Sequence, residues 1–244
     1  MQLFSILGQR CDLAPADRPH CYPDAVIREA THADERFPSG ITGCPVAKLR
    51  EFLDEPLQTP SFAAVLREAE GATRGSEGYG AAKKVLVQYV TIRAFRPEIV
   101  VETGGANGVS SSYLLLAMEK NAAGRLHSID IGEASYLPPG KTTGWIVPQF
   151  LKHRWDFRIG DSKVLLPRLV AELRATDVFI YDSLQVYDHM LWEYRTAYPY
   201  LRAGGLLFSD DALWNNAFPE FVAEVGARQH AVVRGVGFLK KPAA

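Results

Sequence analysis

From residue 79 onward, short apolar runs alternate with longer stretches whose apolar residues recur at helical spacing. Ile99 to Val101 form the first run, and a helical pattern follows from Val109. Similar patterns predict further strands at 125–130, 155–159, 178–181 and 206–209, and helices at 79–95, 147–153, 162–173, 187–198 and 217–225. Two short β runs around Gly235 and Gly237 predict a terminal hairpin with an antiparallel last strand. The sequence therefore predicts a doubly wound, mostly parallel α/β sheet of seven strands, with helices on both faces.

The N-terminal part of the chain has a different pattern. Four prolines interrupt residues 1–44, which predicts irregular structure with one short helix near residues 24–30. Helical spacing returns at 45–53 and again from Pro60, and the glycine-containing stretch 71–78 predicts a hinge or a surface loop. We therefore expect an N-terminal helical cap over residues 1–78 and a sheet domain over residues 79–244.

A glycine-rich turn joins the first strand to its helix. Its pattern is Glu102-x-Gly104-x-x-x-Gly108, with a further glycine at Gly105. Glycine lets a backbone approach a ligand closely, and a helix start offers free N–H groups. The turn fits neither the G-x-G-x-x-G dinucleotide pattern nor a P-loop, because Thr103 takes the place of the first glycine and no lysine follows Gly108. A different kind of nucleotide-binding turn is the remaining interpretation.

The next two strands also end in polar residues. Asp130 ends the second strand, where a carboxylate can accept both ribose hydroxyls of an adenosine; the alternative is a solvated turn residue. After the third strand, Asp161 can cap the following helix, and Asp161 with Ser162 can hydrogen-bond an adenine. These two roles are compatible.

Three carboxyl groups are predicted at the ends of the fourth and fifth strands. Asp182 follows one strand, and Asp210 and Asp211 follow the other. Carboxylates packed together without a cation would have raised pKa values. A hard divalent ion such as Mg²⁺ would relieve the repulsion, which makes all three candidate metal ligands. The alternative is that Asp210 and Asp211 only cap the following helix.

The order of these motifs resembles that of the class I S-adenosylmethionine-dependent methyltransferases over residues 79–240. It is similar in particular to two metal-dependent small-molecule groups, the catechol O-methyltransferase-like enzymes and the sugar O-methyltransferases of macrolide and aminocoumarin pathways. The run PYLRAGGLLFSDD is the most specific stretch. The resemblance implies a Rossmann-like fold, S-adenosylmethionine and Mg²⁺ as cofactors, and metal ligation by Asp182, Asp210 and Asp211. It implies cofactor contacts by Glu102, Gly104, Gly105, Asn107, Ser110, Asp130, Asp161 and Ser162.

The chain departs from both groups where the general base should lie. Ser183, Leu184 and Gln185 follow Asp182, so neither the lysine of the catechol-type enzymes nor the second acid of the sugar-type enzymes is present. His189, one helical turn beyond Gln185, is the candidate base alongside Asp182. A polar histidine on the helix surface is an equal alternative, and a base from the cap, His20 or His32, is another. Trp214, Tyr187, Phe37 and Tyr22 are candidates for an acceptor wall, and core or lid packing is an equal explanation for them.

Bulk properties favour a small-molecule enzyme. The formal net charge of -1 offers no nucleic-acid surface, and no apolar run is long enough to span a membrane. The three cysteines, Cys11, Cys21 and Cys44, are irregularly spaced, which indicates reduced thiols in a cytoplasmic protein. We expect methyl transfer to a vicinal diol, sugar or catechol-like hydroxyl, and the N-terminal segment could support a homodimer. A metal-independent N- or O-methyltransferase, a non-catalytic S-adenosylmethionine-binding partner subunit and, more distantly, a nicotinamide dehydrogenase are the alternatives.

Overall fold

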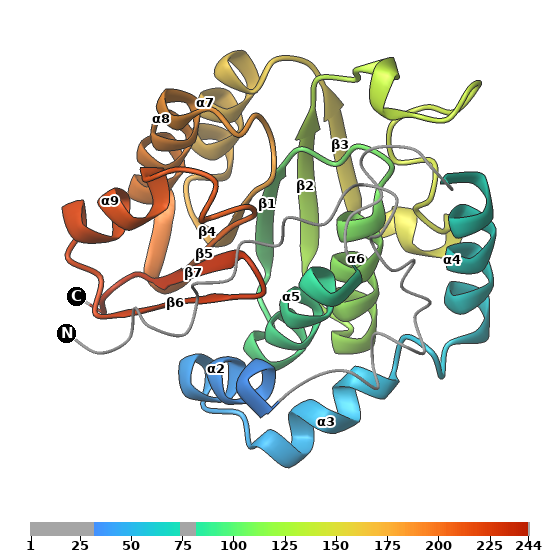
Figure 1. Cartoon of the computed structure of the whole chain (residues 1–244), viewed down its shortest axis with the longest axis horizontal. Coiled ribbons are helices and arrows are strands. Elements are labelled where there is room, and N and C mark those ends of the chain that lie inside the picture. The colour runs from blue at the N-terminus through green and yellow to red at the C-terminus, as the bar shows by residue number, and fades with distance from the viewer. Residues whose placement is uncertain (1–31, 74–81, 244) are drawn as a thin grey trace.

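A seven-stranded sheet forms the centre of the protein, seen here in a computed structural model that describes residues 32–73 and 82–243 (Figure 1). The strand order is β3-β2-β1-β4-β5-β7-β6, in which β1 to β5 are parallel and β7 is antiparallel to both β5 and β6. The strands are β1 Ile99–Thr103, β2 Arg125–Asp130, β3 Trp155–Ile159, β4 Thr176–Tyr181, β5 Leu201–Ser209, β6 Gln229–Val233 and β7 Val236–Lys240. The predicted doubly wound α/β fold with its terminal hairpin is confirmed.

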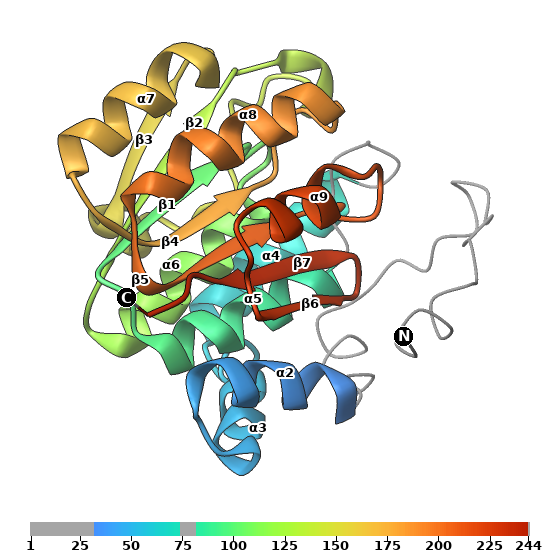
Figure 2. The ribbon, with the colours of Figure 1, turned by 90° about the vertical axis from the view of Figure 1, so that its left-hand side faces the viewer.

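Two layers of helices cover the sheet (Figure 2). α5 (Ala82–Phe95) and α6 (Val109–Asn121) lie on one face, and α7 (Ser162–Leu173), α8 (Tyr187–Ala197) and α9 (Ala217–Glu224) lie on the other. Successive strand residues point to opposite faces. Val100 accordingly packs in the core beneath α5 and α6, whereas its neighbour Val101 packs in the core beneath α7 and α8.

Among the described residues before α5, three helices extend the α5 side of the core. They are α2 (His32–Thr42), α3 (Val46–Asp54) and α4 (Pro60–Thr73). Buried residues such as Phe52 and Phe62 join the same core as α5 and α6. A partly buried ion pair between Arg93 Nε and Glu55 Oε2, at 2.6 Å, attaches this region to α5. These helices therefore share the core of the sheet domain and do not build one of their own.

Several predicted elements need correction. Residues 32–42 are helical, although Pro38 had suggested irregular structure. β5 begins at Leu201, earlier than the predicted strand at 206–209, because Gly204 and Gly205 form backbone hydrogen bonds with Lys241 beyond β7. The predicted helix at 147–153 is a 3₁₀ helix, Gln149–Arg154. The described residues also form short 3₁₀ helices at Ala134–Tyr136 and Tyr198–Tyr200.

Some predictions fall outside the described residues. They concern the helix near residues 24–30, Cys11, Cys21, His20, Tyr22 and the stretch that follows Thr73. Within residues 32–73 and 82–243, no helix combines the length and apolar character needed to cross a membrane.

Candidate functional site

The glycine turn lies between the carboxyl ends of β2 and β4. Gly104 has a φ of +82°, and its N–H donates to the carbonyl of Ile129 at 2.8 Å. A Cβ at this position would lie 1.9 Å from the carbonyl oxygen of Asp182. Only glycine allows this contact, so Gly104 joins the first strand end to the fourth.

Glu102 anchors the turn from below. Its side chain is fully buried, and its carboxylate accepts hydrogen bonds from Ser110 Oγ at 2.7 Å, Ser111 Oγ at 2.6 Å and Ser128 Oγ at 2.7 Å. Burial raises the pKa of Glu102, and the three hydroxyls oppose this shift. Glu102 and Ser110 were predicted to line a cofactor, but here they bind each other and hold the start of α6 to the sheet. Their contact with a cofactor stays a prediction.

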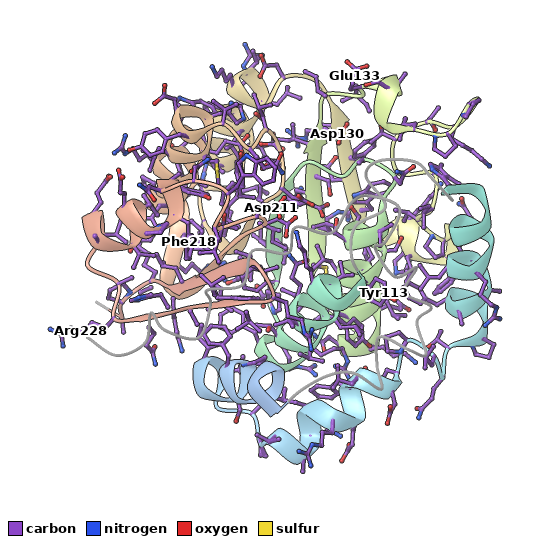
Figure 3. All side chains as sticks on the ribbon, viewed as in Figure 1. Tyr113, Asp130, Glu133, Asp211, Phe218 and Arg228 are labelled. Atoms are coloured by element: carbon purple, nitrogen blue, oxygen red, sulfur yellow. The ribbon has the colours of Figure 1, made fainter. Side chains whose placement is uncertain are left out.

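Asp130 holds the upper side of the turn from the end of β2 (Figure 3). Its Oδ2 accepts the N–H groups of Gly105 and Ala106, each at 2.8 Å, and its Oδ1 accepts the N–H of Gly132 at 2.7 Å. The carboxylate is therefore fixed in orientation beside the glycines. A carboxylate has about four acceptor sites, so the three N–H groups leave Asp130 room for one further donor such as a hydroxyl group.

Asn107 and Asp161 have clear structural partners. Asn107 is fully buried, and its Oδ1 accepts a hydrogen bond from Trp145 Nε1 at 2.7 Å. Asp161 caps α7 through Lys163 N at 2.8 Å, which confirms the predicted cap. Their predicted contacts with a cofactor remain untested, and the position of Asn107 favours a role in shaping the turn.

His189 lies in a separate network beneath the end of β4. Its Nε2 is 2.8 Å from Glu193 Oε1 and 3.3 Å from Ser162 Oγ. Glu193 is fully buried and also accepts hydrogen bonds from Ser183, at 2.9 Å, and from Thr103. The predicted candidate base is thus tied to Glu193, and its role in catalysis stays a prediction.

Asp182, Asp210 and Asp211 form the third group of polar residues at this edge, after the glycine turn with Asp130 and the His189 network. The ends of β4 and β5 bring the three aspartates together, as predicted. Lys84 of α5 joins them: its Nζ lies 2.6 Å from Asp211 Oδ1 and 3.2 Å from Asp210 Oδ2. Burial and the charge of Asp210 raise the pKa of Asp182 well above its usual value. Burial also raises the pKa of Asp210, although Lys84 opposes this shift. Asp211 has a φ of +47°, a left-handed conformation that aspartate tolerates better than most residues.

Comparison with known families decides the identity of this arrangement. A family model described as "Methyltransferase domain" matches residues 101–212, which include the glycine turn, Asp130 and all three aspartates of the third group. Residues 101–212 match a methyltransferase domain. Curated protein sequences give no match to the chain.

Solved methyltransferase structures share the fold of this domain. The O-methyltransferase TomG from Streptomyces achromogenes, solved with S-adenosylmethionine, has a TM-score of 0.58 at 18% identity, over 74% of this chain and 90% of its own. A methyltransferase from Geobacter sulfurreducens has a TM-score of 0.53 at 19% identity, over 81% and 96%. Podospora anserina PaMTH1, solved with S-adenosylhomocysteine, has a TM-score of 0.54 at 14% identity, over 73% and 87%. At these identities the likeness shows the fold.

The predicted magnesium site does not fit the methyltransferase domain as it stands. Within the described residues, no group of three or more histidine, cysteine, aspartate or glutamate side chains is arranged to hold a metal ion. The place between Asp210 and Asp211 is taken by the ammonium of Lys84. We therefore assign no step of the reaction to a divalent ion.

Two residues of the candidate site, Glu193 and Lys84, escaped sequence reasoning. Glu193 lies in a helical stretch, where a glutamate is expected to be exposed to solvent. Lys84 left a weak signal, since a lysine in the first turn of a helix opposes the helix dipole and needs a compensating partner. Its partners are more than 120 residues away in sequence, at the end of β5.

Proposed function

We propose that this methyltransferase transfers a methyl group from S-adenosylmethionine to a hydroxyl oxygen of a small molecule. The observation that carries the proposal is the orientation of Asp130, which three backbone N–H groups hold beside the glycine turn. A carboxylate at the end of the second strand of such a sheet suits a ribose hydroxyl of an adenosine, and Asp130 has one acceptor site left for it. TomG and PaMTH1 were solved with S-adenosylmethionine and S-adenosylhomocysteine, which supports this donor.

Neighbouring residues support an adenosine at this place. Ile131 and Ile159 are exposed apolar side chains directly beside Asp130, and Ile159 pairs with Asp130 across β2 and β3. Exposed isoleucines in adjacent positions suit the faces of an adenine ring. Asp161 and Ser162, at the start of α7, are close enough in sequence to Ile159 to contact the polar edge of the same base.

The acceptor side is apolar around an acidic centre. Exposed apolar side chains follow both acidic strand ends: Leu184 and Val186 follow Asp182, whereas Leu213 and Trp214 follow Asp211. Asn215 Nδ2 contacts Met190 Sδ at 3.1 Å, which connects the segment after Asp211 to α8, the helix that follows Val186. An apolar surface around charged groups suits an acceptor that carries its hydroxyl on an apolar or aromatic skeleton, so catechol-like acceptors are favoured over sugars. Phe37 belongs to the core, because its ring packs 4.9 Å from that of Phe238.

The chain's residues mainly position the two reactants. S-Adenosylmethionine supplies the methyl group: its carbon–sulfur bond breaks as the carbon–oxygen bond forms, the electron pair stays on sulfur, and the hydroxyl proton is released. We assign the acceptance of that proton to Asp211, whose side chain is 34% exposed. Alignment of two bound reactants can contribute about 7–11 kcal/mol to lowering the barrier.

Calorimetric titration with S-adenosylmethionine tests the donor assignment. We expect Asp130→Asn to weaken binding by roughly ten- to a hundredfold, because hydrogen bonds to a charged group are lost. The control is Glu133→Gln, an exposed carboxylate three residues further along (Figure 3). Formation of S-adenosylhomocysteine with catechol, and its absence with the corresponding aniline, would support the hydroxyl acceptor. Unchanged affinity in Asp130→Asn would contradict the ribose assignment.

A further inference from the structure

Lys84 comes from the start of the sheet domain, whereas the acidic residues that it contacts, Asp210 and Asp211, follow β5 near the end of the domain. Because α5 leads directly into β1, it runs antiparallel to that strand, and its first turn lies at the carboxyl edge of the sheet. The side chain passes the β6–β7 turn, where a Cβ on Gly235 would lie 3.8 Å from Lys84 Cε. The backbone N–H of Ala212 donates to the carbonyl of Gly235 at 2.9 Å, so this hairpin turn also fixes the segment that carries Asp211.

The charges around Lys84 keep it an ammonium ion. Its side chain is 26% exposed, and those of Asp210 and Asp211 are 15% and 34% exposed. Burial alone would lower the pKa of Lys84, but the two carboxylates outweigh this effect and leave the pKa raised. A pair of carboxylates that would otherwise repel each other is thus bridged by one cation of the same chain.

We propose that Lys84 is the built-in cation of this methyltransferase. Its ammonium occupies the place between Asp210 and Asp211 where the resemblance implies a divalent ion, and it donates a hydrogen bond to the acceptor oxygen. The proposal rests on methyl transfer to a hydroxyl as the function. Lysine has three N–H donors, of which Asp210 and Asp211 engage two, and the partial exposure of the side chain leaves the third open to a bound molecule.

A divalent ion would compete with this arrangement. Mg²⁺ requires about six oxygen ligands at roughly 2.0–2.1 Å, and Asp210 and Asp211 would be among them. The ammonium already lies within 3.2 Å of both carboxylates. A second cation could bind there only after Lys84 had left, at the cost of both hydrogen bonds. Metal-independent transfer follows from this competition.

Magnesium binding by the chelator-treated full-length chain tests the proposal without an acceptor. We expect millimolar MgCl₂ to leave the unfolding temperature of the wild-type protein unchanged. In Lys84→Met the two carboxylates lose their cation, so we expect a lower unfolding temperature that MgCl₂ raises by several degrees, since a ligand of the folded state stabilises it. Lys84→Arg keeps the charge and should stay insensitive to MgCl₂. Lys48→Met, at an exposed position of α3, is the control.

Catalysis provides a second readout, with catechol as the probe. The wild-type enzyme should form S-adenosylhomocysteine equally well with EDTA and with MgCl₂, whereas Lys84→Met should lose at least tenfold in turnover while binding S-adenosylmethionine normally. The proposal is overturned if MgCl₂ stabilises the wild-type protein, if EDTA abolishes its turnover, or if Lys84→Met behaves like the wild type in both assays. Failure of the wild-type protein to bind S-adenosylmethionine would contradict the proposed function instead, and the magnesium titration would still decide the role of Lys84.

Discussion

The carboxyl edge of this sheet carries two groups of acidic residues that differ in how their charges are satisfied. At β1 and β2, Glu102 accepts three serine hydroxyls and Asp130 accepts three backbone N–H groups. At β4 and β5, Asp210 and Asp211 share the single ammonium of Lys84. Asp210 Oδ1 is buried and receives no N–H or hydroxyl hydrogen bond from the described residues. Asp182 shares a side-chain hydrogen bond with Asp210, but it can donate only while its own carboxyl is protonated.

The acidic residues at β1 and β2 have most of their hydrogen-bond acceptors filled by fixed groups of the protein, whereas those at β4 and β5 do not. Hydrogen bonds from fixed groups hold the first pair in one orientation, so a donor molecule meets a preorganised turn. A buried carboxylate oxygen without a donor costs free energy, and a proton or a bound molecule can recover it. The β4–β5 end is therefore the part of the site that changes when an acceptor binds and reacts.

Gly104 joins the two regions, and its substitution should have the largest effect. In Gly104→Ala the new Cβ would meet the Asp182 carbonyl at 1.9 Å, and the backbone would have to keep a φ of +82°. We expect unfolding to become easier by roughly 3 kcal/mol or more, with loss of S-adenosylmethionine binding. Urea unfolding and calorimetric titration measure both effects.

Gly40→Ala is the matched control for this change. Gly40 lies in α2 with open space around its Cα, and alanine favours a helix by up to about 1 kcal/mol over glycine. It should leave binding unchanged. If Gly104→Ala were as stable as Gly40→Ala, the two acidic regions would not be mechanically connected through this contact.

Removing Glu102 should have the next largest effect. Glu102→Ala leaves three serine hydroxyls, two of them fully buried, without their shared acceptor, and we expect a loss of roughly 2–4 kcal/mol in urea unfolding. Glu102→Gln keeps the size and one acceptor oxygen, so its loss should be below about 1 kcal/mol. Equal losses in the two variants would mean that the negative charge, and not the hydrogen-bonded shape, stabilises the turn.

Much of the fold and of the first region could be predicted from local patterns. The predicted limits of β2, β3 and α7 equal the observed ones, and Asp130 and Asp161 stand where a strand meets a turn. α2 was missed because Pro38 suggested a break, although helical backbone continues through it. The extent of β5 was missed because its glycine pair signals a turn until β7 supplies a partner.

The second region could be predicted only in part. Acidic residues at strand ends can be found in the sequence, since the topology places such ends together. Their cation could not, because Lys84 comes from a helix before the first strand of the domain and meets them only in three dimensions. Which cation pairs with a carboxylate depends on packing between segments that are distant in sequence. The spacing of residues along the chain does not reveal that packing.

The smallest predicted effect is a gain of stability that depends on pH. Burial and Asp210 raise the pKa of Asp182, and Glu102 and Lys84 are the other charged groups that act on it. A carboxyl whose pKa is raised by folding contributes its full stability below the unfolded value of about 3.9. That contribution is lost as the pH rises through the folded pKa, at roughly 1.4 kcal/mol for each unit of the shift. Asp182→Asn removes the loss, so the variant should be more stable than the wild type at pH 8.

Thermal unfolding at two pH values checks this sign. The advantage of Asp182→Asn should be greatest at pH 8 and shrink as the pH falls towards about 4, where the wild-type carboxyl is itself protonated in both states. Asp54→Asn, at an exposed position of α3, should differ little from the wild type at either pH. If Asp182→Asn were instead less stable at pH 8, Asp182 would be a charged partner of Lys84. The β4–β5 region would then be as fully satisfied as the glycine turn, and the contrast between the two acidic regions would disappear.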